Sequence, residues 1–288
     1  MARYRSWLFV PANRPDRVVK AFASGADAVI IDLEDACPVA EKVASRALVA
    51  EAIANHSGAH AFVRINAATT PLALADLAAV IVPGLSGIVL PKAETLGMLH
   101  AIDWAIGQFE TERGLATGTV ELMPLVESAL GLVDLAAIAR SGLSRIRRLT
   151  FGAGDLTLDL GARWTTDEAE LFPLRSALVA VSRAAGLAPP IDTPWPAIHD
   201  QAGYDRCLER VRDLGFGGKM LIHPSHVEAA NRTFMPSAEA VDYARRVIAA
   251  AAEAEASGSG AFQLDGRLID QVNIVQARRV LDAHEASR

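Results

Sequence analysis

Short apolar runs rich in β-branched residues alternate along the chain with longer segments in which apolar residues recur at helical spacing. Such alternation is typical of consecutive strand–helix units. Strands are expected at residues 5–12, 27–35, 60–66, 87–93, 120–128, 148–155, 189–195 and 217–223. Eight units within about 235 residues predict an α/β fold, a (β/α)₈ TIM barrel, whose usual length is about 250 residues.

A doubly wound parallel sheet is the alternative fold, but no GxGxxG sequence follows the first expected strand to support a dinucleotide site. The residues beyond the eighth unit have a different character. A helix is expected around 237–254, followed by the small-residue linker "EASGSGAFQ" and a final helix over 271–286. The chain is therefore expected to contain a catalytic barrel, residues 1–235, and a C-terminal helical extension or lid, residues 236–288.

The composition is that of an ordinary globular protein, with 51% hydrophobic and 22% charged residues among 288. The net charge of -6 argues against nucleic acid as a partner. No apolar run reaches the roughly 18 residues of a bilayer-spanning helix, and the N-terminal apolar run is too short for a signal peptide. A cytoplasmic protein without membrane association is therefore expected. Cys37 and Cys207 are isolated, which favours reduced thiols.

Polar side chains follow the expected strands at their carboxyl ends, where a TIM barrel builds its active site. These strand-end residues are Asp32, Glu34, Asp35, Arg64, Asn66, Lys92, Glu127, Asp155, Asp192 and His223. Taken alone, each residue is as compatible with a structural role, as a helix N-cap or in a loop ion pair, as with a role in a functional site. Together they bring several carboxylates to one barrel mouth, where like charges repel unless a cation or a shared proton compensates them.

Glu127 and Asp155 end adjacent expected strands, about 4.8 Å apart, so their carboxylates can converge on one ion. An all-oxygen site with two protein carboxylates suits Mg²⁺, which keeps water or substrate oxygens in its shell. Gly152 and Gly154 precede Asp155 and let the backbone approach a bound anion closely, which makes Gly154 a candidate substrate-binding residue. The alternative is that both glycines only relieve crowding at the barrel rim.

A family resemblance is carried by "RSWLFVPANRPDR", "GADAVIIDLEDA", "FVRIN", "LPKAET", "PLVESALGL", "FGAGDLTLDLG", "GFGGKMLIHPSHV" and "DGRLID". In this order, these segments resemble the citrate lyase β-subunit-like (CitE-like) branch of the HpcH/HpaI aldolase superfamily, which includes malyl-CoA and citramalyl-CoA lyases. The resemblance implies a Mg²⁺-dependent carbon–carbon lyase on a TIM barrel that acts on 3-hydroxyacyl-CoA thioesters. It also implies a homo-oligomer, a trimer or larger.

The resemblance assigns roles to residues of this chain. The implied metal ligands are Glu127 and Asp155, and the implied catalytic residues are Arg64, which polarises the substrate, Glu34, and Asp270, an acid or base from a neighbouring subunit. The implied substrate- or CoA-binding residues are Arg64, Asp32, Asp35, Lys92 and Gly154, with Arg14 near the CoA phosphates. Asp32, Glu34 and Asp35 would support the waters of the metal. For Asp270 the alternative is an N-cap of the final helix, and the two roles are compatible.

The chain departs from the family pattern at two places. Val272 stands where the family often has a proline, which bears on the position of the final helix, and "IDTPWPAIHD" differs from the usual "ID.VY.D..D", which bears on acyl-group specificity. Three functions stay open: a free-standing CoA-thioester lyase, a thioester hydrolase on the same scaffold, and a citryl-carrier-protein lyase subunit of a citrate lyase complex. The lyase is favoured. A non-catalytic binding role is the least favoured, because each implied catalytic position holds the residue type that the chemistry needs.

Overall fold

The structure is a computed structural model that describes residues 4–256 and 261–285. Parallel strands close into a barrel in which each strand pairs with its neighbours in chain order and the last strand returns to the first. The strands are β1 (Ser6–Pro11), β2 (Ala28–Asp32), β3 (His60–Arg64), β4 (Leu85–Leu90), β5 (Glu121–Val126), β6 (Thr150–Phe151), β7 (Ile191–Asp192) and β8 (Gly218–Leu221). Every segment that was expected to hold a strand overlaps one, and the predicted TIM barrel is confirmed.

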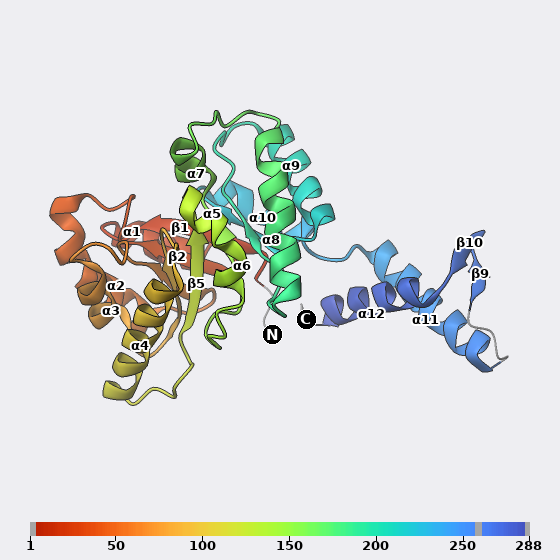
Figure 1. Cartoon of the computed structure of the whole chain (residues 1–288), viewed down its shortest axis with the longest axis horizontal. Helices are drawn as coiled ribbons and strands as arrows, with labels where there is room; N and C mark the ends of the chain where they lie inside the picture. The colour runs from red at the N-terminus through yellow and green to blue at the C-terminus, as the bar shows by residue number, and fades with distance from the viewer. Residues whose placement is uncertain (1–3, 257–260, 286–288) are drawn as a thin grey trace. The chain divides into compact units, whose positions relative to one another are not determined.

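Helices connect successive strands and surround the barrel (Figure 1). They are α1 (Pro15–Phe22), α2 (Lys42–Asn55), α3 (Ala73–Val80), α4 (Leu96–Glu112), α5 (Ala129–Val133), α6 (Leu135–Ala139), α7 (Ala153–Asp159), α8 (Phe172–Ala184) and α9 (Gln201–Leu214), and α10 (Val227–Thr233) follows the last strand. Short 3₁₀ turns lie at η1 (Val39–Glu41), η2 (Ala169–Leu171) and η3 (Pro224–His226). No helix in the described ranges is both long and apolar enough to cross a membrane.

Apolar side chains from the strands fill the inside of the barrel. Trp7, Ile30, Phe62 and Met123 belong to one buried cluster there. The Phe62 ring occupies the space beside Gly87 on the next strand, where a Cβ atom would overlap it. A large side chain on one strand is thus accommodated by the smallest residue on its neighbour, as the narrow interior of an eight-stranded barrel requires.

The sixth strand is shorter than the sequence predicted, and this moves a candidate site residue. The strand expected over 148–155 ends at Phe151, and the helix α7 begins at Ala153. The backbone N–H of Ala153 donates to Thr193 Oγ1 at 3.0 Å, which satisfies one of the free amides at the start of a helix. Asp155 therefore lies in the first turn of α7 rather than on a strand, a position where the helix dipole favours a negative charge.

The residues from Arg232 onward form a second compact unit, distinct from the barrel unit Tyr4–Asn231. Its further elements are α11 (Ala238–Ala256), β9 (Phe262–Leu264), β10 (Arg267–Ile269) and α12 (Gln271–Glu285). The two helices pack against each other around a small apolar cluster that includes Val247 and Ile269.

Between the two helices of the C-terminal unit, which was expected as a helical extension, β9 and β10 pair as an antiparallel hairpin that the sequence analysis did not predict. Its turn is Asp265–Gly266, with φ angles of 50° and 77°. Two positive φ angles are what the tightest hairpin turns need, and an Asp-Gly pair accommodates them. Part of the predicted small-residue linker, residues 257–260, lies outside the described residues.

Candidate active site

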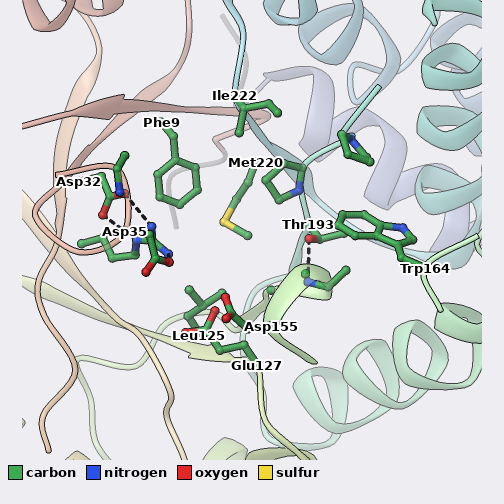
Figure 2. A pocket seen from close by; sticks show the side chains of 17 residues that line it. Phe9, Asp32, Asp35, Leu125, Glu127, Asp155, Trp164, Thr193, Met220 and Ile222 are labelled. Carbon is green, nitrogen blue, oxygen red and sulfur yellow. Dashed lines mark hydrogen bonds and ion pairs between the residues drawn. The ribbon is translucent and has the colours of Figure 1, made fainter. Parts of the chain in front are cut away.

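A pocket of about 430 Å³ opens at the carboxyl ends of the barrel strands (Figure 2). Its lining includes residues at or just beyond the ends of six strands: Asp32, Arg64, Glu127, Gly152, Thr193 and Ile222. The carboxyl end of a TIM barrel is where catalytic residues from different strands meet. This pocket is therefore the candidate active site.

Glu127 follows β5 directly and is 3% exposed. Its Oε1 accepts a hydrogen bond from the backbone N–H of Lys92 at 2.9 Å, and Lys92 adopts a left-handed φ of 49°. The backbone of Gly152 lies close to the other carboxylate oxygen of Glu127, since a Cβ atom built on Gly152 would lie 2.5 Å from Oε2. A larger residue there would require the Glu127 side chain to move. Burial, followed by the negative charge of Glu34, raises the pKa of Glu127 to about 8.

Asp155 lines the same pocket as Glu127, and Figure 2 shows the two carboxylates at one wall. Their charges interact, since Asp155 is among the groups that raise the pKa of Glu127. Neither the Asp155 carboxylate nor Glu127 Oε2 takes a hydrogen bond from the described residues. Within those residues no three acidic, histidine or cysteine side chains form a metal-ligand group. The two carboxylates are therefore the acidic groups that this wall offers to an ion.

Arg64 ends β3 and is 9% exposed. Its Nε and Nη2 donate to the two oxygens of Asp32 at 2.7 and 2.6 Å. Its Nη1 lies 3.1 Å from Glu34 Oε2 and 3.3 Å from Asp35 Oδ2. The guanidinium carbon also lies 5.1 Å from the centre of the Phe9 ring. This bidentate pairing and stacking hold the arginine in one orientation in the pocket.

The three acids after β2 have different environments. Asp32 is 1% exposed and also accepts from the backbone N–H groups of Glu34 and Ala36, each at 2.9 Å, so its carboxylate is fully engaged within the protein. Glu34 is buried, and its Oε2 pairs with Arg64 without forming a hydrogen bond. Burial raises the pKa of Glu34 to about 7, although Arg64 lowers it. Asp35 is 64% exposed at the pocket and has room to meet solvent.

A buried network supports the loop that carries Glu34, and the sequence analysis missed most of it. Lys42 donates to the backbone oxygens of Leu33 and Glu34 at 2.9 and 2.6 Å and to Asn66 Oδ1 at 2.5 Å. Asn66 donates its Nδ2 to Asp76 Oδ2 at 2.7 Å. Asn66 was found as a strand-end residue, whereas Lys42 and Asp76 lie on α2 and α3, where the sequence alone shows ordinary helix charges.

The apolar side chains of the pocket were also missed. Phe9, Trp164, Met220 and Ile222 line it, as does Thr193. Met220 and Ile222 are two residues apart at the end of β8, so they project to the same side of the strand. A period-of-two reading of this strand end would have identified both as candidates.

Two predicted binding residues do not belong to the pocket lining among the described residues. The side chain of Lys92 is exposed, and its backbone serves Glu127 instead. Arg14 pairs with Asp16 on the surface, with Nε 3.2 Å from Oδ1. Gly154 does line the pocket, and a Cβ atom there would meet nothing closer than the Trp164 ring at 3.9 Å.

Asp270 belongs to the C-terminal unit and is exposed. Its Oδ1 accepts from the backbone N–H groups of Val272 at 2.9 Å and Asn273 at 3.3 Å, while its own N–H donates to Asn273 Oδ1 at 3.0 Å. This reciprocal arrangement caps the start of α12. The N-cap alternative for Asp270 is therefore correct, and Oδ2 makes no hydrogen bond with the described residues.

Asp192, another strand-end residue, is fully buried instead of facing the pocket. It accepts from Arg175 Nε and Nη2 at 2.8 and 3.1 Å and from Lys219 Nζ. Arg175 also donates to Glu168 Oε2 at 2.9 Å, and the Trp164 indole N–H lies 3.4 Å from Glu168 Oε1. A chain of buried charges thus ends at a side chain of the pocket wall.

The comparison with known proteins identifies the family of the chain. The family model described as HpcH/HpaI aldolase/citrate lyase matches residues 5–224. The chain is 36% identical to citrate lyase subunit beta of Leuconostoc mesenteroides subsp. cremoris, over 98% of this chain and 94% of that protein. It is 33% identical to (3S)-malyl-CoA thioesterase of Cereibacter sphaeroides, over 98% of this chain and 95% of that protein.

Among solved structures, the chain is similar to the protein CitE from Mycobacterium tuberculosis in complex with magnesium, acetoacetate and coenzyme A. The sequence identity is 30%, the TM-score is 0.77, and the match covers 99% of each chain. The match therefore includes the C-terminal unit as well as the barrel. From the family model and these relatives, the chain belongs to the HpcH/HpaI aldolase/citrate lyase family of enzymes.

Proposed function

We propose that this protein is a Mg²⁺-dependent carbon–carbon lyase that cleaves a 3-hydroxyacyl-CoA thioester, such as malyl-CoA or citramalyl-CoA, to acetyl-CoA and a 2-oxo acid. One observation carries the proposal: the free carboxylate oxygens of Glu127 and Asp155 share a pocket with the oriented guanidinium of Arg64. The solved CitE relative, which holds magnesium and coenzyme A, supports the choice of metal and thioester.

The donor set at this wall fits Mg²⁺. Both side chains offer hard carboxylate oxygens, and a Mg²⁺ ion with one or two protein carboxylates fills its shell with water or substrate oxygens. Glu127 is buried, so little water hydrates its carboxylate, and a bound cation would compensate its negative charge instead. Glu127 and Asp155 would hold the ion, which when bound acts as a Lewis acid that stabilises negative charge on substrate oxygens.

The reaction breaks the bond between C2 and C3 of the thioester. The C3 hydroxyl loses its proton and becomes the carbonyl of the 2-oxo acid, while the electron pair passes to C2 and the thioester as an enolate. The enolate then takes up a proton at C2 to form acetyl-CoA. Arg64 places a fixed positive charge where negative charge develops, and Asp32 holds it in that orientation. We assign Glu34 and Asp35 to ordering solvent around the carboxylates.

We further propose that Asp270 carries the proton for C2 and comes from a neighbouring subunit of a homo-oligomer. Its Oδ2 takes no hydrogen bond from the described residues while Oδ1 caps α12, so both roles are compatible. Mixing an Asp155→Ala protein with an Asp270→Asn protein tests this, because asparagine keeps the helix cap but removes the acid. Activity should return when subunits exchange. Background activity after exchange is verified by a label would refute the shared site.

A thioester hydrolase is the second candidate, favoured by the identity to (3S)-malyl-CoA thioesterase. A citrate lyase subunit is the third, favoured by the identity to citrate lyase subunit beta. In the hydrolase the C–S bond breaks, and free CoA thiol appears instead of a 2-oxo acid.

The deciding experiment incubates the purified protein and Mg²⁺ with malyl-, citramalyl- and citryl-CoA and with citryl carrier protein. Release of 2-oxo acid and free thiol is followed in parallel, with Asp155→Ala as the matched control. The lyase releases 2-oxo acid from a CoA thioester without free thiol. Release of thiol alone identifies the hydrolase, cleavage of the carrier-bound substrate alone identifies the subunit, and no reaction at all refutes the proposal.

A further inference from the structure

One residue behind the pocket combines a strained backbone with complete burial. Glu168 has φ and ψ angles of 54° and 29°, in the left-handed region, and its side chain is 0% exposed. This backbone conformation is unfavourable for a residue with a Cβ atom. Among the described residues, the other non-glycine residues with a positive φ are Lys92, whose backbone serves Glu127, and Asp265 in the hairpin turn. Because such strain persists only where the surrounding structure enforces it, and is concentrated at functional sites, Glu168 is a candidate for a role in the site.

The Glu168 carboxylate is surrounded by hydrogen-bond donors. Its Oε2 accepts from Arg175 Nη1 at 2.9 Å and from the Cys207 thiol at 3.2 Å. Its Oε1 faces the indole N–H of Trp164 at 3.4 Å. Burial raises the pKa of Cys207 to about 11, so the thiol keeps its proton and donates. A side chain that satisfies all three donors must accept hydrogen bonds at both of its polar ends, as a carboxylate does.

Through Oε1, Glu168 reaches the lining of the pocket. Trp164 lies in the segment between α7 and η2 and lines the pocket (Figure 2). Its ring is 3.9 Å from the position of a Cβ atom built on Gly154, so the indole lies beside the first turn of α7, which carries Asp155. A substrate held at Asp155 therefore meets the indole ring.

Through Oε2, Glu168 reaches a second part of the lining. Arg175 bridges Glu168 and Asp192, with its Nε 2.8 Å from Asp192 Oδ1. Thr193 follows Asp192 in the chain, lines the pocket and accepts the first backbone N–H of α7. One buried carboxylate is thus connected to two parts of the pocket lining, and Trp164 is the part that it contacts directly.

We infer, on the basis of the proposed function, that Trp164 contacts the substrate and that Glu168 is the positioning residue that fixes the indole ring. The ring packs on the part of the substrate next to the metal-binding acids, in the ground state and in the transition state alike. Glu168 acts through Trp164 and touches no reacting atom, since its side chain is fully buried. Loss of the carboxylate therefore weakens substrate binding and leaves the bond-breaking step unchanged.

Glu168→Gln tests this inference, because an amide accepts at one end and donates at the other. The charged Arg175 keeps the amide oxygen, so the NH₂ group faces the Trp164 N–H and the ring is released. KM for malyl- or citramalyl-CoA should rise about tenfold while kcat changes by less than about threefold. Trp164→Phe, which has no N–H, should raise KM by a similar factor. The double variant should raise KM no further, whereas independent effects would multiply to about 100-fold.

Glu110→Gln is the matched control. Glu110 is also 0% exposed and also paired with a buried arginine, Arg145, but it lies on α4 and outside the pocket lining. This variant should lose stability to urea as Glu168→Gln does and leave KM unchanged. An unchanged KM in Glu168→Gln, a multiplied KM in the double variant, or an equal rise of KM in Glu110→Gln would overturn the inference.

A fluorescence measurement separates the inference from the proposed function. The emission of Trp164 is obtained as the difference between each protein and the same protein carrying Trp164→Phe. Acrylamide should quench this emission about twofold more strongly in Glu168→Gln than in the unsubstituted protein, and Glu110→Gln should show no change. Equal quenching in all three proteins would overturn the role of Glu168, with or without turnover. If quenching changes as expected but no thioester is cleaved, the proposed function fails and with it the substrate contact, whereas the positioning of Trp164 by Glu168 stands.

Discussion

Replacing Asp192 by asparagine removes the carboxylate that the buried cations Arg175 and Lys219 share, while Arg175 keeps its second ion pair with Glu168. Burial alone would raise the pKa of Asp192, but the attraction of Lys219 and Arg175 outweighs it and the pKa lies below its usual value. Breaking a buried ion pair on one side costs about 3–5 kcal/mol, because the Lys219 ammonium stays buried without its carboxylate partner. We expect Asp192→Asn to lose a free energy of unfolding of that size.

Urea denaturation at pH 7, followed by far-UV circular dichroism, measures this loss. The control is Asp213→Asn, because Asp213 pairs with Arg212 on the surface and its removal should cost less than about 1 kcal/mol. Since the folded pKa of Asp192 is lowered, its contribution is present at neutral pH and disappears as the pH falls below about 4. A loss below about 1 kcal/mol in Asp192→Asn, equal to that of the control, would refute the reasoning.

Three further outcomes are expected. Gly152→Ala places a Cβ atom 2.5 Å from Glu127 Oε2, so calorimetry should show Mg²⁺ affinity lowered by about tenfold or more, whereas Gly154→Ala has room and should not lower it. Arg64→Lys loses the forked pairing with an acid, so kcat should fall by about 100-fold; near-normal turnover would make its role structural. Burial raises the pKa of Cys207 to about 11, so mass spectrometry should find it alkylated at pH 8 about 100-fold more slowly in the folded than in the unfolded protein, and equal rates would contradict its burial.

The fold was predictable because buried residues are apolar and recur in the sequence at a spacing that differs between strands and helices. The apolar runs at 27–35 and 60–66, for example, contain β2 and β3, and the polar residues that follow them are those at the barrel mouth. The carboxyl ends of parallel strands meet at one end of a barrel, so Arg64 and Glu127 could be placed in one site without a structure.

Contacts between segments far apart in the sequence could not be predicted in this way. The sequence was consistent with Asp192 at the barrel mouth, but in the structure Asp192 is buried and paired with Arg175 and Lys219. The spacing of residues in the sequence does not distinguish a charged residue in a buried ion pair from one that is available to a ligand. The position of Asp155 on a helix depends on a hydroxyl from Thr193, which lies close only in the closed barrel.

The sequence by itself thus determined the barrel, its mouth and most of the charged candidates, since these follow from local periodicity and from the direction of the strands. The tertiary structure alone decided which acids are free and which are paired, with Asp32 bound to Arg64 and Asp155 left open to the pocket. It also decided that Met220 and Ile222 form a wall opposite Glu127. The reason is physical: pairing, burial and shape depend on distances between segments, and the order of residues sets those distances only through the complete fold.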